Sequence, residues 1–303
     1  MSFASKLKVE LSKSVNESQC CRDAELYGMM LFAYICRNDN IRFQTENKNI
    51  AERISQLLYE CVDIIVKPTQ ISTEGLYIIN ITDPGLLRLI FGWFPDGHIG
   101  ISLRINRDVI ESNCCMSAFI RGVFLSCGSI SDPKKGYHLE FNIQYTKLSN
   151  DFVEVLKNND FVPKKIIRKF YHVIYIKESE TIEDLLTFMG ASQSFFDFTD
   201  IKIEKEIRNN VNRVTNCELS NIEKSAYAAV EQLKVIEKLY KAKIVDTLPA
   251  HLMELANLRI ANPDLSLKEL GELTDPPLSK SGVNHRMKNI MKYAAEIKDD
   301  KKS

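Results

Sequence analysis

The sequence predicts an α+β protein with two parts. They are an internally duplicated body in the first two thirds and a small all-α helix-turn-helix domain at the C-terminus. A segment that begins with two cysteines recurs 94 residues further along, at Cys20 and at Cys114. The same order of helical and extended stretches follows each copy. Near the C-terminus, a capping motif and a basic helix predict the helix-turn-helix. A length of 303 residues accommodates both parts and a connecting helix.

The two copies of the repeat span residues 20–112 and 114–215. Each is expected to form a helix, strands, a second helix, a further strand and a final helix. Strand-like stretches lie at 41–45, 76–81, 138–145 and 172–176, and helical patterns lie at 50–59, 86–91, 150–156 and 182–189. The first nine residues of the copies, 20–28 and 114–122, align without a gap at Cys-Cys, Ala and Gly. We therefore expect two similar halves related by a pseudo-twofold axis.

A glycine stands at the same point of both repeated helices, as Gly28 and Gly122. A small residue lets two helix backbones approach closely. We expect these helices to pack against each other at the two glycines, within a chain that is monomeric.

Residues 122–130, GVFLSCGSI, resemble the LAGLIDADG motif of homing endonucleases. The resemblance implies a body of that fold, in which an acid of each motif holds a divalent metal for phosphodiester hydrolysis. That acid would stand five residues after the interface glycine, which gives Ala33 and Cys127. Neither offers the oxygen ligand that magnesium prefers, and the motif's earlier acid is replaced by Leu31 and Leu125. We expect a degenerate active site, with no catalytic residue, metal or cofactor.

A capping box predicts the second helix of the C-terminal domain. Ser266 precedes Glu269 by three residues, so each side chain can hydrogen-bond a free backbone N–H at the helix start. An amphipathic first helix is expected before Asn262-Pro263, from Leu252, Leu255, Ala256, Leu258 and Arg259. Residues 275–277, Asp-Pro-Pro, end the second helix.

The third helix is expected at 279–298, and the motif as a whole at 266–298. Its inward stripe comprises Val283, Met287, Ile290 and Ala294. No acidic residue occurs from 280 through 292. We expect phosphate contacts from Lys280, Arg286, Lys288 and Lys292, and contacts to base edges from Ser281, Asn284 and His285. A solvated lysine face on a three-helix bundle stays open as an alternative. Gly282 is expected to permit a close approach, to DNA or to the second helix.

The formal net charge is zero, so affinity for nucleic acid would have to come from a local basic surface. The N-terminus lacks the apolar segment of a signal peptide, and the longest apolar run, 28–36, is too short to cross a bilayer. We expect a cytoplasmic, nucleoid-associated protein that does not enter the membrane. The eight cysteines show no CxxC pair and no zinc-ligand spacing, which predicts reduced, buried thiols.

Three further features are open to two interpretations each. Asparagines and an arginine at 209–221 could contact phosphates or cap helix ends. Apolar spacing from 222 to 243 predicts a linker helix whose apolar face packs on the body, in preference to forming a groove for a partner. Arg121 could face DNA or lie at the surface.

Longer segments resemble the WhiA proteins of Gram-positive bacteria. They are MSFASKLKVEL at the N-terminus, VNRVTNCELSNIEK at 211–224, and most of the stretch from 246 to 290. The resemblance implies sequence-specific DNA binding in transcription regulation, cell division, chromosome segregation and, in some relatives, sporulation. The expected domains are a homing-endonuclease-like body at 1–218, a linker helix at 219–245 and the helix-turn-helix domain at 246–303.

Double-stranded DNA is the expected partner, with an RNA polymerase sigma factor or another regulator considered beside it. An active nuclease or maturase is one alternative, and the missing acids argue against it. A ligand-sensing regulator is the other, and a thermal-shift measurement against metabolites would distinguish it.

Overall fold

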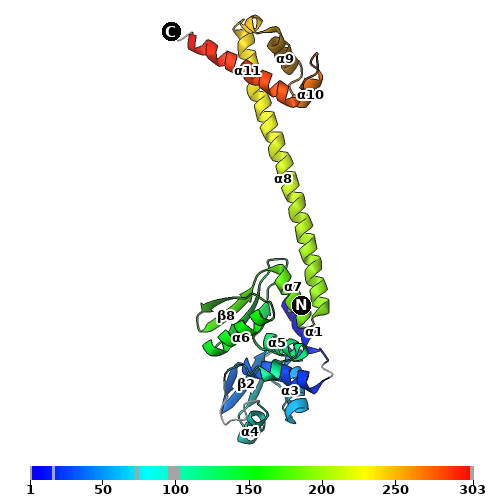
Figure 1. Ribbon diagram of the computed structural model, residues 1–303, viewed down its shortest axis with the longest axis vertical. Coiled ribbons are helices and arrows are strands. Elements are labelled where there is room, and N and C mark those ends of the chain that lie inside the picture. The colour runs from blue at the N-terminus through cyan, green and yellow to red at the C-terminus, as the bar shows by residue number, and fades with distance from the viewer. Residues whose placement is uncertain (1, 16–17, 72–74, 95–102, 301–303) are drawn as a thin grey trace. The chain divides into compact units, whose positions relative to one another are not determined.

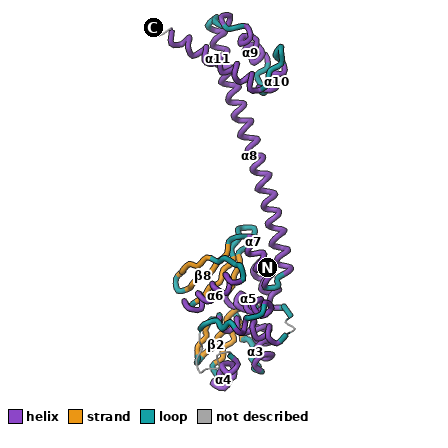
Figure 2. The backbone as a smooth tube through the Cα atoms, in the orientation of Figure 1, coloured by secondary structure: helices purple, strands orange, loops and turns teal. Residues whose placement is uncertain are grey.

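The computed structural model describes residues 2–15, 18–71, 75–94 and 103–300. The chain divides into two compact units, Met1–Glu206 and Ile207–Ser303 (Figure 1). All strands of the described residues lie in the first unit, and the second contains helices and loops (Figure 2).

The first half of the body forms a four-stranded antiparallel sheet in the order β1-β2-β4-β3. Its strands are β1 (Ile35–Arg37), β2 (Asn40–Thr45), β3 (Thr69–Gln70) and β4 (Tyr77–Ile81). Its helices are α2 (Gln19–Leu31), α3 (Lys48–Val62) and α4 (Pro84–Trp93). Helix α3 packs on β2 and β4, because alternate strand residues such as Ile41 and Phe43 turn their side chains into the core.

The second half repeats this plan after a short 3-10 turn, η1 (Asp108–Ile110). Its sheet has the order β5-β6-β8-β7, which matches the first sheet strand for strand. The strands are β5 (Gly128–Ile130), β6 (Leu139–Ile143), β7 (Lys164–Arg168) and β8 (Tyr171–Ile176). The helices are α5 (Asn113–Cys127), α6 (Thr146–Asn158) and α7 (Ser179–Phe188). The predicted duplication and fold class are confirmed. The outer strands β1, β3, β5 and β7 were not predicted one by one.

The repeated helices α2 and α5 run side by side through the centre of the body. A Cβ atom placed on Gly28 would lie 2.5 Å from the carbonyl oxygen of Phe119, and one on Gly122 would overlap the carbonyl oxygen of Glu25. The two backbones are therefore in direct contact at both glycines, as their spacing predicts.

Helix α1 (Phe3–Ser12) fixes the start of α8 (Ser192–Lys241). The Glu10 carboxylate accepts backbone N–H bonds from Gln193 at 2.7 Å and Ser194 at 2.9 Å. These are N–H groups that a helix cannot bond internally at its first turn. From there α8 continues for 50 residues, because it contains no glycine or proline to break it.

The C-terminal end of α8 belongs to the second unit. Ile236 and Leu239 are buried in its core, together with residues of α9 and α11. Ala226 is exposed and Ala229 is half-buried. The buried apolar side chains at this end of α8 therefore serve the C-terminal core, and packing of the linker helix on the body stays a prediction.

After η2 (Val245–Thr247) the second unit comprises α9 (Ala250–Ala261), α10 (Leu267–Glu272) and α11 (Lys280–Asp300). The three helices contact one another around a core that includes Leu255, Leu270, Val283, Met287 and Ile290. The side chain of Arg259, predicted on the first helix, is also fully buried and donates to the carbonyl oxygen of Leu265.

Candidate nucleic-acid interface

Two local features set the geometry of α10 and the turn that leads to α11. The capping box is present: Ser266 Oγ accepts from the N–H of Glu269 at 3.3 Å, and the Glu269 carboxylate accepts from the N–H of Ser266 at 2.7 Å. At the other end of α10, a Cβ on Gly271 would overlap the carbonyl oxygen of Leu278. The turn before α11 therefore packs directly on the backbone of α10.

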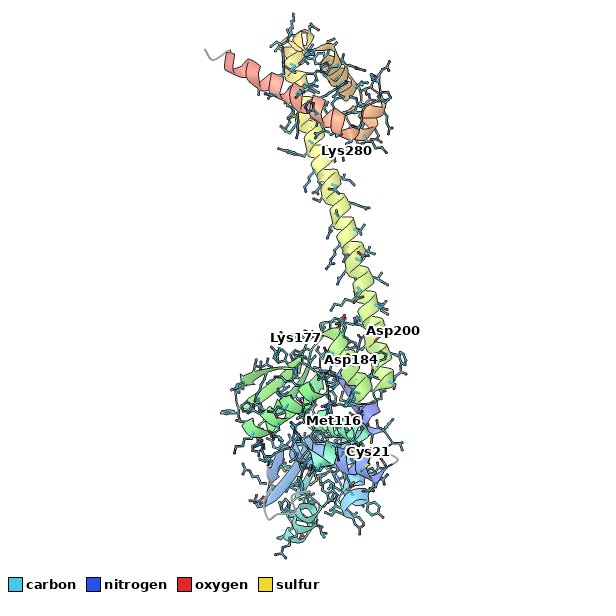
Figure 3. All side chains as sticks on the ribbon, in the orientation of Figure 1. Cys21, Met116, Lys177, Asp184, Asp200 and Lys280 are labelled. Carbon is cyan, nitrogen blue, oxygen red and sulfur yellow. The ribbon has the colours of Figure 1, made fainter. Side chains whose placement is uncertain are left out.

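Helix α11 has one buried and one exposed face, as its sequence predicts. Val283, Met287 and Ile290 are buried, and Ala294 is half-buried. At 100° per residue, these side chains fall in one narrow sector. Six of the seven candidate contact residues occupy an arc of about 140° that begins beside this sector with Lys280 and continues to the opposite side. All six are exposed: Lys280, Ser281, Asn284, His285, Lys288 and Lys292. Lys280 lies at the start of the helix (Figure 3).

Arg286 is the exception among the candidates. It is half-buried, and its guanidinium donates to the carbonyl oxygen of His251 on α9 at 3.4 Å. Two residues of the exposed arc contact neighbours outside it. The Ser281 hydroxyl lies 2.9 Å from that of Ser279, and His285 Nδ1 lies 3.5 Å from Asn289 Nδ2. The arc therefore offers amide, hydroxyl, imidazole and ammonium groups along one helix.

Gly282 is not needed for contact with the second helix. The nearest atoms to a Cβ built there are 3.6 Å away, in Leu278 and Ser279, which is ordinary van der Waals contact. The glycine that a close approach requires is Gly271. Sequence reasoning missed it because the contact is with the loop that follows α10.

The two degenerate active-site positions lie near each other at the C-terminal ends of α2 and α5. Ala33 and Cys127 line one surface pocket of about 320 Å³ with Gln44, Asn142 and Tyr171. The described residues around it include no carboxylate. Burial raises the pKa of the Cys127 thiol to about 12, against the opposing effect of Lys8. A lone thiol is also not the hard oxygen ligand that magnesium prefers.

Arg121 neither faces DNA nor lies at the surface, so both interpretations of it are wrong. It is buried beside Glu25 and Arg53 between the central helices. Its Nη2 lies 3.0 Å from Glu25 Oε2, and Arg53 Nε lies 2.9 Å from Glu25 Oε1. Arg121 also donates to the carbonyl oxygen of Met189 at 3.2 Å. A buried carboxylate thus joins an arginine of each half.

The polar cluster at 209–221 does not cap a helix. All of its asparagines and Arg213 are exposed in the middle of the unbroken helix α8. The capping interpretation is wrong, because a cap needs a helix end. The contact of this cluster with phosphates stays a prediction.

Among the described residues, no helix combines the length and the apolar character that crossing a membrane requires.

Family models match the second half of the body and most of the C-terminal unit. Residues 116–208 match the WhiA LAGLIDADG-like domain, and residues 211–294 match the WhiA C-terminal HTH domain.

Two relatives carry the name "Probable cell division protein WhiA". The one from Clostridium botulinum (strain Eklund 17B / Type B) is 38% identical over 314 residues, covering 98% of this chain and 99% of the relative. The one from Caldicellulosiruptor saccharolyticus is 37% identical over 314 residues, covering 98% and 96%.

Two solved structures share the fold. Full-length DUF199/WhiA from Thermatoga maritima has a TM-score of 0.59 at 23% identity, covering 98% of this chain and 99% of that chain. The N-terminal LAGLIDADG domain of DUF199/WhiA has a TM-score of 0.51 at 19% identity, covering 62% of this chain and 90% of that chain.

Proposed function

The chain belongs to the WhiA family, and we propose that it is a sequence-specific double-stranded DNA-binding regulator that acts through α11. The observation that carries the proposal is the exposed face of α11 from 280 to 292, which contains no acidic residue and where lysines flank Ser281, Asn284 and His285. Lysines bind phosphates, and an asparagine can hydrogen-bond an adenine edge with two atoms. The regulation serves cell division, in keeping with the names of the relatives.

The body acts as a scaffold without nuclease activity. This part of the proposal is supported by the pocket at Ala33 and Cys127, whose described lining lacks a carboxylate. A two-metal or one-metal phosphodiester hydrolysis needs hard oxygen ligands. The protonated thiol of Cys127 supplies none.

The salt dependence of DNA binding tests the role of the lysines. Full-length protein is first used to select a preferred duplex from a random library. Contacts with about four phosphates should give a slope of roughly −3 to −4 for log affinity against log salt. Lys288→Ala should reduce the magnitude of that slope by about one, with a similar loss of affinity on every duplex.

Lys157→Ala is the matched control, because Lys157 is an exposed lysine on α6 of the body. Its slope should equal that of the wild type. A slope that Lys288→Ala leaves unchanged would remove α11 from the phosphate contacts.

A further inference from the structure

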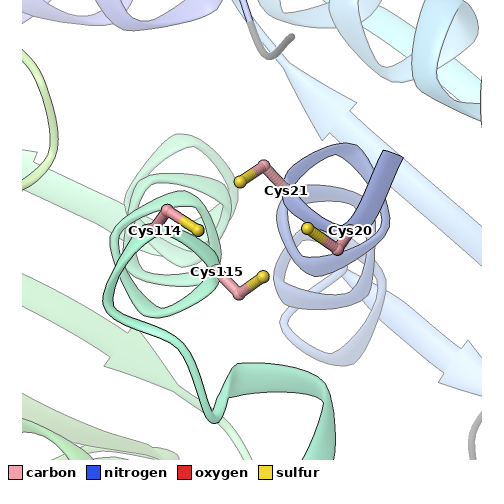
Figure 4. A group of neighbouring side chains, drawn as sticks. All are labelled: Cys20, Cys21, Cys114 and Cys115. Carbon is pink, nitrogen blue, oxygen red and sulfur yellow. The ribbon is translucent and has the colours of Figure 1, made fainter. Parts of the chain in front are cut away.

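The two cysteine pairs of the repeat meet at one point of the body. Cys20 and Cys21 lie in the first turn of α2, and Cys114 and Cys115 lie in the first turn of α5. Because α2 and α5 pack with the same direction, their N-terminal ends are adjacent. The four Sγ atoms lie within 4.8 Å of one another and point into the space between the helices (Figure 4).

The arrangement follows the internal symmetry of the body. Cys20 pairs with Cys115 across the interface, and Cys21 pairs with Cys114. Cys20 is equivalent to Cys114 in the repeat, so the pseudo-twofold axis exchanges the two pairs. The four sulfur atoms therefore surround the axis, two from each helix.

From this geometry we propose that Cys20, Cys21, Cys114 and Cys115 bind one structural Zn²⁺ ion. Zinc prefers four thiolates at about 2.3 Å in a tetrahedron, which puts the sulfur atoms about 3.8 Å apart. Sulfur atoms already within 4.8 Å reach that spacing by small side-chain rotations. An iron–sulfur cluster places several atoms between its thiolates, so it needs a wider cage than this one.

The surroundings favour the thiolate forms that zinc requires. Both pairs stand at helix N-termini, where the helix dipole stabilises negative charge. The serine hydroxyl groups at the two helix starts add polar contacts, with Ser18 Oγ 3.1 Å from Cys21 Sγ and Ser112 Oγ 3.3 Å from Cys114 Sγ. Binding replaces four S–H protons by one Zn²⁺, and the protons leave to solvent.

The cysteine cluster differs from two expectations from the sequence, that the thiols are buried and that no metal binds. Cys21 and Cys115 are buried, but Cys20 and Cys114 are exposed, so the eight thiols are not uniformly buried. The expectation of no metal rested on spacing within single segments. The cluster instead joins two segments 94 residues apart. Its role would be to fasten the two halves of the body at the end of α2 and α5 opposite Ala33 and Cys127.

Cobalt substitution in the full-length, reduced protein tests the site. Co²⁺ takes the place of Zn²⁺ and gives intense visible bands when four thiolates hold it in a tetrahedron. We expect one Co²⁺ per chain, and its bands should vanish when one equivalent of Zn²⁺ is added. The Cys20→Ser/Cys114→Ser variant changes only the exposed thiols, so the fold should persist, as circular dichroism can check. The Co²⁺ affinity of this variant should fall more than about 100-fold. That is a larger loss than the removal of a residue that only hydrogen-bonds a metal ligand would cause.

Cys217→Ser is the matched control, because Cys217 is exposed on α8. It should bind Co²⁺ like the wild type. In a second measurement, Zn²⁺ should protect Cys20 and Cys114 from alkylation and leave Cys217 reactive.

Either of two results would overturn the proposal. One is a wild-type protein that shows no tetrahedral cobalt bands. The same holds if the protein is isolated with two disulfides, as mass spectrometry would detect, and still binds no Co²⁺ after these are reduced. The other is a double variant that retains the bands.

Discussion

Gly122 sets how closely the two halves of the body approach. The Glu25 carbonyl oxygen occupies the space that a Cβ atom on Gly122 would need. Even Gly122→Ala should therefore force α2 and α5 apart. Overpacking of this kind costs about 1–3 kcal/mol or more, which a thermal or denaturant melt measures. Gly92→Ala is the control, since nothing lies within 4 Å of a Cβ built on Gly92 in α4. Gly92→Ala should stabilise the protein by up to about 1 kcal/mol, because alanine favours the helical conformation more than glycine does. Equal melting curves for the two variants would mean that the helices do not meet at Gly122.

The Glu25 carboxylate lies 2.9 Å from Arg53 and 3.0 Å from Arg121, and all three side chains are buried. Glu25→Ala should therefore remove a carboxylate that both buried guanidinium groups contact. Breaking a buried ion pair from one side costs about 3–5 kcal/mol. Denaturant unfolding should record a loss of this size.

Glu154→Ala provides the comparison at the surface. Glu154 pairs with Arg107 at 3.2 Å, and both side chains are about half exposed or more. Its loss should cost less than about 1 kcal/mol. A Glu25→Ala protein no less stable than Glu154→Ala would contradict the buried network.

At the scale of elements, the contact between α10 and the turn before α11 decides how α11 is held. Gly271→Ala would drive a methyl group into the Leu278 carbonyl oxygen. We expect it to destabilise the second unit and to weaken binding to any duplex. Gly282→Ala meets only ordinary contacts and should keep the wild-type melting behaviour. Circular dichroism melts on the full chain measure both. Equal melting temperatures for Gly271→Ala and Gly282→Ala would contradict a close contact between α10 and the turn before α11.

The main elements of both units could be predicted because their buried residues keep a clear period. Strand β2 alternates around Ile41 and Phe43, and α11 repeats Val283, Met287 and Ile290 at helical spacing. The outer strands β1 and β5 have three residues each, which is too short to show a period. β3 is two exposed residues, and four of the five residues of β7 are exposed.

Features that depend on two distant segments could not be predicted from one of them. The burial of Arg121 depends on Glu25, which lies 96 residues away on the other central helix. The cysteine cluster depends on two helix ends that meet at the pseudo-twofold axis. The equivalent position of the Cys-Cys pairs in both repeats was the available signal, since side-by-side helices place equivalent residues together.

At the scale of the whole molecule, the endonuclease-like body should bind or support DNA without cutting it. Purified protein incubated with Mg²⁺ or Mn²⁺ and a plasmid that carries selected sites should leave the plasmid supercoiled. The reason is the lack of carboxylates around Ala33 and Cys127 in the described lining. Gln44→Ala and Asn142→Ala, in the same pocket, serve as controls. Cutting that these variants abolish would reveal an active site, whereas cutting that persists would indicate a contaminant.

The central claim is that α11, and not the body, gives the whole chain its sequence selectivity. The most direct measurement is the ratio of affinities of full-length protein for its selected duplex and for an unrelated duplex, before and after Asn284→Ala. Asn284 is exposed in the middle of the polar arc, so loss of its base contact should cost about 1–3 kcal/mol on the selected duplex and little on the other. The ratio should fall accordingly. A ratio that stays at the wild-type value in Asn284→Ala, and also when Ser281 and His285 are changed to alanine with it, would assign the selectivity to the body and contradict the claim.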